Sequence, residues 1–319
     1  MKKKYILLLA ITILVELTLF TFATYRFNRK VLPNTSVASS ASSSSSVSSK
    51  AKVVNYTNEY VKENTVKEEP KALDRTIPEI PDPKLSYKVV SMMYHHINPD
   101  TVNDPKDSVL RGLSMSPAKF EEDLKDIKEK GYETVFPYEI KEKLLNNEKQ
   151  EKKYVLLTID DGYLDIYLYA FPLLKKYNMK ATFYVIPNLV GQFDPKSVNN
   201  AGNYATWEQL TEMNESGLIN IGSHTMDHAE LTNKKYKDAD LRYQIFNSKD
   251  ILQRKLGIKI KDFCYPYGKY NDQIVKLVKE AGYETATIIE GKNEISLSNI
   301  FVWKRFHSSE TIPMRNYLK

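Results

Sequence analysis

The chain has 319 residues, a formal net charge of +6 at pH 7, 42% hydrophobic residues and a single cysteine. One cysteine, Cys264, excludes an intramolecular disulfide and a cysteine-based metal cluster. The lysines are spread along the chain without a basic segment interleaved with aromatic residues, so we expect no nucleic-acid partner. The region after the first eighty or so residues is long enough for one large α/β domain.

Residues 1–30 have the pattern of a cytoplasmic tail followed by a transmembrane signal anchor. An apolar run from Tyr5 to about Tyr25 is long enough to span a bilayer, and basic residues lie on both sides of it. The small-x-small pattern of a cleavable signal peptide fits poorly after this run. We therefore expect an uncleaved, single-pass membrane anchor, whose orientation the flanking charges do not settle.

Residues 31–85 are predicted to be a flexible linker without a fold of its own. Serine and alanine dominate residues 37–50, charged residues dominate 52–71, and Pro78, Pro81 and Pro83 stiffen the approach to the domain. We place the folded domain at residues 86–319.

Two apolar strands are predicted to end in metal-ligand side chains. Residues 153–159 lead into Asp160, Asp161 and a glycine, and residues 218–223 lead into His224 and His228. Each motif alone is more often a solvated turn or a surface pair, but their joint occurrence at two strand ends favours a metal site. Two imidazoles and one carboxylate suit a catalytic zinc ion with an open position for water. The other aspartate is then free to act as a base.

A third predicted strand, residues 86–94, ends in the pair His95 and His96. Histidine is the side chain best suited to acid and base chemistry near neutral pH. Such a pair is more often packed than catalytic, but its place at a strand end resembles that of the other two motifs.

The remaining pattern alternates helices and strands. Further strands are predicted near residues 132–137, 181–187, 262–268 and 283–289, and helices near 117–131, 163–177, 206–217, 235–256 and 274–282. Strands separated by helices pair in parallel through right-handed crossovers, and about seven candidate strands favour a barrel over an open sheet. Tyr204 and Trp207, near a helix start, are assigned to packing.

Three motifs carry a resemblance to a known family. In order, they are Thr158-Ile-Asp-Asp-Gly162, Ser223-His-Thr-Met-Asp-His228 and Tyr265-Pro-Tyr-Gly268. Over about residues 86–310 the chain resembles the polysaccharide deacetylase family, also called the NodB-homology domain or carbohydrate esterase family 4. Met93-Tyr-His-His-Ile97 further resembles a branch that includes poly-N-acetylglucosamine deacetylases and cell-wall polysaccharide de-N-acetylases. The resemblance implies an α/β fold, a distorted (β/α)7 barrel.

The resemblance also implies roles for the motif residues. Asp160 corresponds to the general base, and Asp161 to a metal ligand together with His224 and His228. The main-chain N–H of Tyr267 corresponds to an oxyanion donor, and His95 to the general acid. One divalent metal ion is expected, Zn²⁺ first, although the same ligands suit Co²⁺ or Ni²⁺.

The chain departs from the family pattern in three places. Cys264 stands where most members have an arginine that tunes the base, and we hypothesise that Arg305 replaces it. The fourth family motif, with aspartate and tryptophan, is not visible near residues 285–290. The late leucine-x-histidine motif is only partly matched, at Arg305-Phe-His307. As candidates for the general acid, His95 therefore ranks first and His307 second. His96 ranks third and is expected to be a packing or substrate neighbour.

Two functional classes follow. The first is a monomeric, metal-dependent enzyme of the cell membrane whose catalytic domain faces the cell wall. It would release acetate from N-acetylhexosamine, in the first place N-acetylglucosamine, in a cell-wall or surface polysaccharide. The alternative is a non-catalytic glycan-binding or structural wall protein on a decayed deacetylase fold, for which the missing arginine and fourth motif argue. Retention of both aspartates and both motif histidines favours the enzyme.

Overall fold

A closed barrel of parallel strands forms the centre of the computed structural model, which describes residues 85–103, 106–195, 197, 201–291 and 294–319. Around the ring the strand order is β1-β11-β9-β8-β7-β6-β5, and β5 pairs with β1 to close it. The ring strands are β1 (Ser86–Tyr94), β5 (Lys153–Ile159), β6 (Ala181–Val185), β7 (Ile219–Ser223), β8 (Asp262–Cys264), β9 (Thr285–Ile289) and β11 (Trp303–His307). The predicted (β/α)7 barrel is therefore confirmed.

Short strands extend the barrel at its edges. β4 (Tyr132–Thr134) pairs with the start of β5, and β10 (Glu294–Ser296) pairs antiparallel with the start of β1. A separate small sheet joins β2 (His96–Ile97) to β3 (Ser114–Met115). The predicted set of seven strands included residues 132–137, which lie outside the ring, and omitted β11, which is a ring strand.

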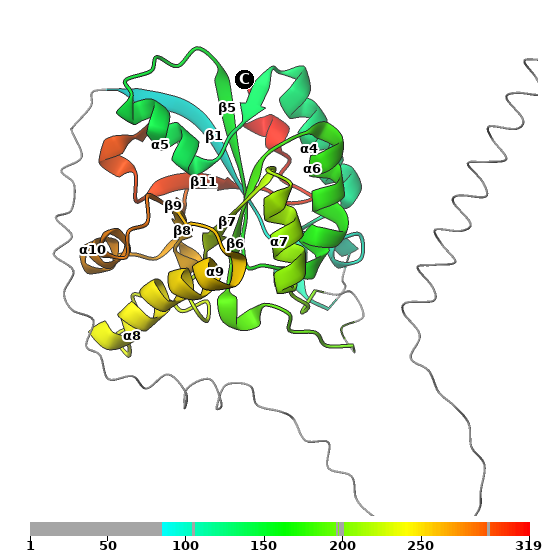
Figure 1. Cartoon of the computed structure of the whole chain (residues 1–319). Coiled ribbons are helices and arrows are strands. Elements are labelled where there is room, and N and C mark those ends of the chain that lie inside the picture. The colour runs from blue at the N-terminus through cyan, green and yellow to red at the C-terminus, as the bar shows by residue number, and fades with distance from the viewer. Residues whose placement is uncertain (1–84, 104–105, 196, 198–200, 292–293) are drawn as a thin grey trace, which may run out of the picture. The chain divides into compact units, whose positions relative to one another are not determined.

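Helices surround the ring (Figure 1). They are α3 (Ser108–Gly112), α4 (Pro117–Glu129), α5 (Pro137–Leu145), α6 (Phe171–Tyr177), α7 (Trp207–Glu215), α8 (Asp238–Arg242), α9 (Ser248–Leu256) and α10 (Asp272–Glu280). Their starts follow from sequence: the hydroxyl of Ser116 caps α4 ahead of Pro117, and Thr206 and Gln209 form the predicted capping box of α7.

Two π-helical turns interrupt the helical segments. Residues Ile166–Ala170 wind as a π-helix directly before α6, where Pro172 lacks the N–H of a regular α-helical bond. Residues Tyr243–Asn247 join α8 to α9, so the predicted long helix at about 235–256 is one helical segment with a π turn inside it.

The apolar faces of strands and helices merge into one core. Ring strands bury residues on both faces, as expected for parallel strands covered by helices; β6 is buried along its whole length. Within the described residues, no helix is long and apolar enough to cross a membrane. The expected anchor at residues 1–30 and the linker up to residue 84 lie outside the described range.

Candidate active site

The carboxyl ends of neighbouring strands bring the predicted site residues together. The main-chain N–H of Asp160, after β5, donates to Tyr94 O at the end of β1 over 2.9 Å. On the other side of β1, the register pairs Met93 with His307 on β11. His95, Asp160 and His307 therefore come from adjacent strands, as the parallel arrangement predicts.

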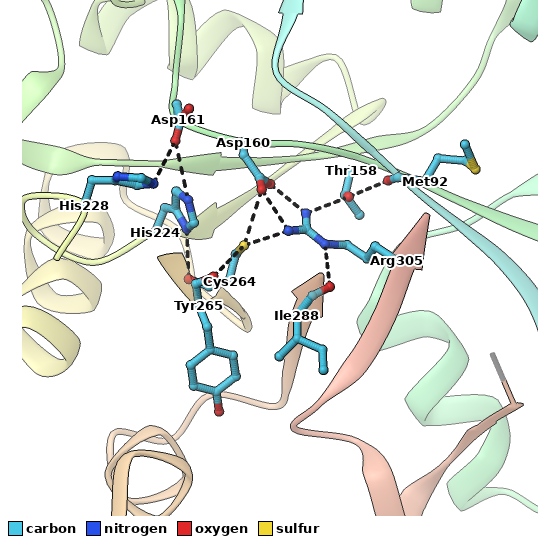
Figure 2. Close-up of polar contacts among 10 residues, drawn as sticks. All are labelled: Met92, Thr158, Asp160, Asp161, His224, His228, Cys264, Tyr265, Ile288 and Arg305. Carbon is cyan, nitrogen blue, oxygen red and sulfur yellow. Dashed lines mark hydrogen bonds and ion pairs between the residues drawn. The ribbon is translucent and has the colours of Figure 1, made fainter. Parts of the chain in front are cut away.

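Asp161, His224 and His228 form a cluster with the chemistry of a cation site (Figure 2). Asp161 Oδ1 lies 3.4 Å from Nε2 of each histidine, and the three ligand atoms lie within 4.8 Å of one another. His224 Nδ1 contacts the carbonyl of Cys264 at 2.9 Å, so Nδ1 carries the proton and Nε2 keeps its lone pair. Asp161 Oδ1 is buried and has no hydrogen-bond partner among the described residues. These donors fit a divalent metal ion.

The pKa of Asp161 also agrees with a role as a metal ligand, because a ligating carboxylate must be ionised. Burial raises the pKa of its carboxyl, but the interaction with His224, and after it with His95 and His228, outweighs burial, and the pKa lies well below its ordinary value. A second group, Asp160, His224 and Cys264, is equally compact. It fits a cation less well, because both oxygens of Asp160 already face Arg305.

Four non-glycine residues of the site adopt the left-handed backbone conformation. They are Asp161 (φ 77°), Thr225 (φ 65°), His228 (φ 57°) and Tyr267 (φ 60°). Such residues cost about 1–3 kcal/mol each and persist where surrounding contacts hold them. Gln244 supplies such contacts, since its Oε1 accepts from the main-chain N–H groups of residues 226 and 227 at 3.0 and 3.1 Å.

Asp160 is buried in a two-point ion pair with Arg305. The guanidinium Nη1 and Nη2 lie 2.7 and 2.8 Å from the two carboxylate oxygens (Figure 2). Arg305 also donates to Ile288 O and Thr158 Oγ1, and its Nη2 lies 3.1 Å from Cys264 Sγ. Burial raises the pKa of Asp160, but the charge and hydrogen bonds of Arg305 outweigh it and hold the pKa below its ordinary value. Arg305 thus contacts the proposed base directly, as expected if it replaces the arginine that most family members have at the position of Cys264.

His95 and His307 face each other with their ring centroids 6.2 Å apart. His95 Nδ1 and His307 Nε2 are buried and have no hydrogen-bond partner among the described residues. Burial lowers the pKa of both imidazoles, and for His95 the nearby charges of Asp160 and Asp161 act in the opposite direction. Both candidates for the general acid are present, and the ranking of His95 first stays a prediction.

The other predicted residues occupy distinct places. His96 is buried, contacts Asp165 Oδ2 at 2.8 Å through Nδ1 and stacks on Tyr163, which fits a packing neighbour. Tyr267 is 54% exposed, and its ring centroid lies 4.7 Å from that of His228. The next residue is Gly268, where an added Cβ would lie 2.8 Å from Ile289 N, so the chain here packs directly on β9.

Sequence reasoning missed the aromatic neighbours of this site. Tyr163 follows the Asp-Asp-Gly turn and stacks on both His96 and Tyr204. The only hint in the sequence was that Tyr163 lies two residues after Asp161. Tyr204, which we assigned to packing beside a helix start, pairs with Tyr163 through an isolated β-bridge.

Comparison with known proteins agrees with this fold. Residues 147–286 match the family profile described as polysaccharide deacetylase. The matched region, which is less than half of the chain, is similar to the polysaccharide deacetylase family, whose fold is the NodB-homology domain. YxkH of Bacillus subtilis, a provisional polysaccharide deacetylase by name, is 32% identical over 203 residues, which cover 64% of this chain and 65% of that protein.

Other relatives and solved structures carry related names. Poly-β-1,6-N-acetyl-D-glucosamine N-deacetylase of Staphylococcus epidermidis is 29% identical over 66% of this chain and 76% of its own. The Escherichia coli K12 protein of the same name is 23% identical, and the match covers 63% of this chain and 34% of that protein. Deacetylase PplD of Streptococcus pyogenes, solved with acetate, has 28% identity and a TM-score of 0.63 over 73% of this chain and 98% of its own. The chain thus spans less than two thirds of the length of the first two relatives, YxkH and the E. coli protein.

Proposed function

We propose that the domain hydrolyses the acetamide of N-acetylhexosamine residues, in the first place N-acetylglucosamine, in a cell-wall or surface polysaccharide. The products are acetate and a free amine on the sugar. One observation carries the proposal: an arginine-paired carboxylate, Asp160, lies directly beside the Asp161, His224 and His228 cluster. The names of the staphylococcal and E. coli relatives support the choice of substrate.

The cluster would hold one divalent ion, with Zn²⁺ as the first choice and Co²⁺ or Ni²⁺ as alternatives. When bound there, the ion would polarise the acetyl carbonyl and favour ionisation of water near neutral pH. Asp161 supplies the negative charge, and the histidines supply neutral nitrogen ligands. The hydrogen bond from His224 Nδ1 to Cys264 O fixes the tautomer that leaves Nε2 free to bind.

The remaining steps belong to the residues of the chain. Asp160 takes a proton from the attacking water as the new C–O bond forms, and Arg305 keeps that carboxylate ionised and oriented. The main-chain N–H of Tyr267 donates to the oxyanion. His95, protonated on its unpaired Nδ1, gives the proton to the sugar nitrogen as the C–N bond breaks. The oxygen of water ends in acetate, and the nitrogen leaves as the amine.

We also propose, from the sequence, that a single-pass anchor at residues 1–30 holds a monomeric catalytic domain outside the cell membrane and facing the wall. Protease treatment of intact cells with the wall removed tests this placement. The domain is expected to be digested, and protection of the domain would contradict it.

Acetate release from N-acetylglucosamine oligomers, with zinc added to the purified protein, tests the proposed activity. An Asp160→Asn variant is the matched control, because it keeps the side-chain size and removes the base. Release by the wild type that disappears in the variant is the expected result. If the protein binds one metal per chain and releases nothing, the substrate class is wrong. If it neither binds metal nor releases acetate, the non-catalytic glycan-binding protein is favoured.

A further inference from the structure

The two histidines of the proposed metal site lie on one short loop, whose middle is held by a side chain from the next helical segment. Thr225 and His228 adopt left-handed backbone conformations, with φ of 65° and 57°, and bracket Met226 and Asp227. Such conformations persist only where surrounding contacts hold them. The position of His228 relative to His224 therefore depends on what holds residues 226 and 227.

Gln244 is the side chain that holds them. It is 5% exposed and belongs to the π-helical turn Tyr243–Asn247 between α8 and α9. Its Oε1 accepts from the main-chain N–H groups of Met226 and Asp227 at 3.0 and 3.1 Å, which uses the full accepting capacity of an amide oxygen. Its Nε2 donates to Asp227 Oδ2 at 2.8 Å, and Asp227 Oδ1 accepts from Asn188. One amide thus contacts the loop at three points.

The two histidines differ in how they are held. The main-chain N–H of His224 donates to Val185 O at 2.9 Å, and its Nδ1 donates to Cys264 O at 2.9 Å. His228 instead follows directly after the two residues that Gln244 holds. Met226 is buried, so its N–H would lose its acceptor with the glutamine amide and could reach water only if the loop moved. That movement would displace His228 more than His224.

We propose that Gln244 is a positioning residue for the metal ligand His228. Its amide fixes the main chain just before the histidine, and so keeps the imidazole turned toward Asp161, whose Oδ1 lies 3.4 Å from His228 Nε2. The role rests on the metal site of the proposed function. Groups that orient metal ligands through hydrogen bonds are typically worth about 10- to 100-fold in metal affinity.

Zinc affinity, measured by competition with a chromogenic chelator on the purified protein, tests the proposal without relying on turnover. Gln244→Met keeps the length of the side chain and removes its hydrogen bonds, so we expect about 10- to 100-fold weaker zinc binding. Gln253→Met is the matched control. It is the same substitution in α9, where Gln253 Oε1 accepts from the main-chain N–H of Ile260 at 3.2 Å, and zinc binding should be unchanged. Thermal unfolding with excess chelator shows whether each variant folds.

A double variant, Gln244→Glu with Asp227→Asn, exchanges donor and acceptor without changing the net charge. One oxygen of the new carboxylate can accept from the two main-chain N–H groups, and the other from the new amide at position 227. The oxygen of that amide can still accept from Asn188. We expect this variant to bind zinc about as tightly as the wild type, because every hydrogen bond of the loop is kept.

The outcomes separate this role from the function on which it rests. If the folded wild type binds no zinc, the metal site itself is refuted, and the role of Gln244 with it. If the wild type binds zinc and Gln244→Met binds it equally well, the site stands and the positioning role is wrong. Equal weakening by Gln253→Met would also overturn the role, because the effect would then be a general loss of stability.

The double variant decides the matter if Gln244→Met does not fold. Zinc binding close to that of the wild type supports the role, because the exchanged hydrogen bonds then suffice to place His228. A folded double variant whose zinc binding is about 10- to 100-fold weaker contradicts it, because the same bonds would then be present without their effect.

Discussion

Arg305 and Asp160 are separated by 145 positions in the chain and form a buried ion pair through two hydrogen bonds. β11 delivers the arginine and β5 delivers the aspartate, and β1 lies between these two strands in the ring. Cys264 stands where most family members have an arginine next to the base. In this chain the positive charge beside Asp160 comes instead from Arg305 on β11.

Replacing Arg305 is expected to impair both stability and activity. Arg305→Ala leaves a buried carboxylate without its partner, which costs about 3–5 kcal/mol in the free energy of unfolding. Arg305→Lys keeps the charge but not the two-point geometry, so the pKa of Asp160 rises and the ascending limb of the pH–activity profile moves to higher pH. Denaturant unfolding and acetate release between pH 5 and 9 measure the two effects.

Arg315→Ala is the matched control for this pair. Arg315 forms an ion pair with Glu122 in which both side chains are half exposed, so its loss should change the unfolding free energy by less than about 1 kcal/mol. An Arg305→Lys protein with an unchanged acid limb would show that Arg305 does not tune the base.

Removing the metal should lower the free energy of unfolding by an amount that depends on the metal affinity and the free metal concentration. At free zinc about 100 times its dissociation constant, a ligand that binds only the folded state stabilises it by about 2.7 kcal/mol. We expect Asp161→Asn to lose this increment, and Asp227→Asn, in the same loop as His228, to retain it, because Asp227 contacts Asn188 and Gln244 instead. Unfolding curves with and without chelator measure the increment. An equal increment in Asp161→Asn would remove Asp161 from the ligand set.

The general acid can be assigned with two substrates. His95→Gln is expected to slow amide hydrolysis by about 10²- to 10⁴-fold, because the amine leaves only when protonated. Its effect on 4-nitrophenyl acetate should be far smaller, since nitrophenolate leaves without a proton. In the wild type, activity on the amide falls as the pH rises through the pKa of the acid, and burial lowers that pKa for His95. If His307→Gln shows this substrate-dependent loss and His95→Gln does not, the two roles are reversed.

A glycine in β7 is needed for the packing under the ion pair. An added Cβ at Gly222 would lie 2.5 Å from the ring of Tyr184, and the guanidinium carbon of Arg305 lies 5.7 Å from the centroid of that ring. Gly222→Ala should therefore cost about 1–3 kcal/mol in unfolding free energy. Gly112→Ala, in α3 with nothing within 4 Å of the added atom, should be neutral or stabilising. Equal stabilities of the two variants would contradict the packing argument.

Asp262 should make stability depend on pH in the opposite sense to a salt-bridged aspartate. Burial raises its pKa from 3.8 to about 6, although hydrogen bonds from Thr285 and Asn220 oppose the rise. The folded state then holds a proton that the unfolded state has released, so the stability from this group is full below pH 4 and is lost as the pH rises through about 6. That difference corresponds to about 3 kcal/mol.

The contribution of Asp262 is isolated by comparison with Asp262→Asn in excess chelator. The unfolding free energy of the wild type, relative to the variant, should fall by about 3 kcal/mol between pH 4 and pH 7.5. A difference that stays constant over this range would show that the buried carboxyl titrates normally.

Local patterns in the sequence predicted most of the barrel and the metal-ligand cluster. Apolar runs that end in Asp160, His224 and His95 located three strand ends, and capping residues such as Ser116 and Thr206 located helix starts. These signals are local, because a strand end and a cap are defined within a few residues. The ring strand at residues 303–307 was missed, because exposed Lys304 and buried Arg305 interrupt its apolar pattern.

Contacts between distant segments could not be predicted from local patterns in the sequence. Arg305 was proposed as a substitute from family comparison, but its two-point contact with Asp160 depends on the order of strands around the ring. The stack of Tyr163 on His96 and Tyr204 joins three segments that no local pattern relates. The left-handed conformations of Asp161, Thr225, His228 and Tyr267 were equally hidden, since only glycine signals such a backbone directly.

Ring closure through β11 has a consequence for synthesis of the protein. β1, made first among the ring strands, pairs on one side with β11, which is made last. The unfinished chain lacks the counter-ion of Asp160 until β11 has been made and is free to fold. Translation of the domain must therefore be nearly complete before the barrel closes, and chains that stop before β11 are expected to be recognised by chaperones and proteases as unfinished.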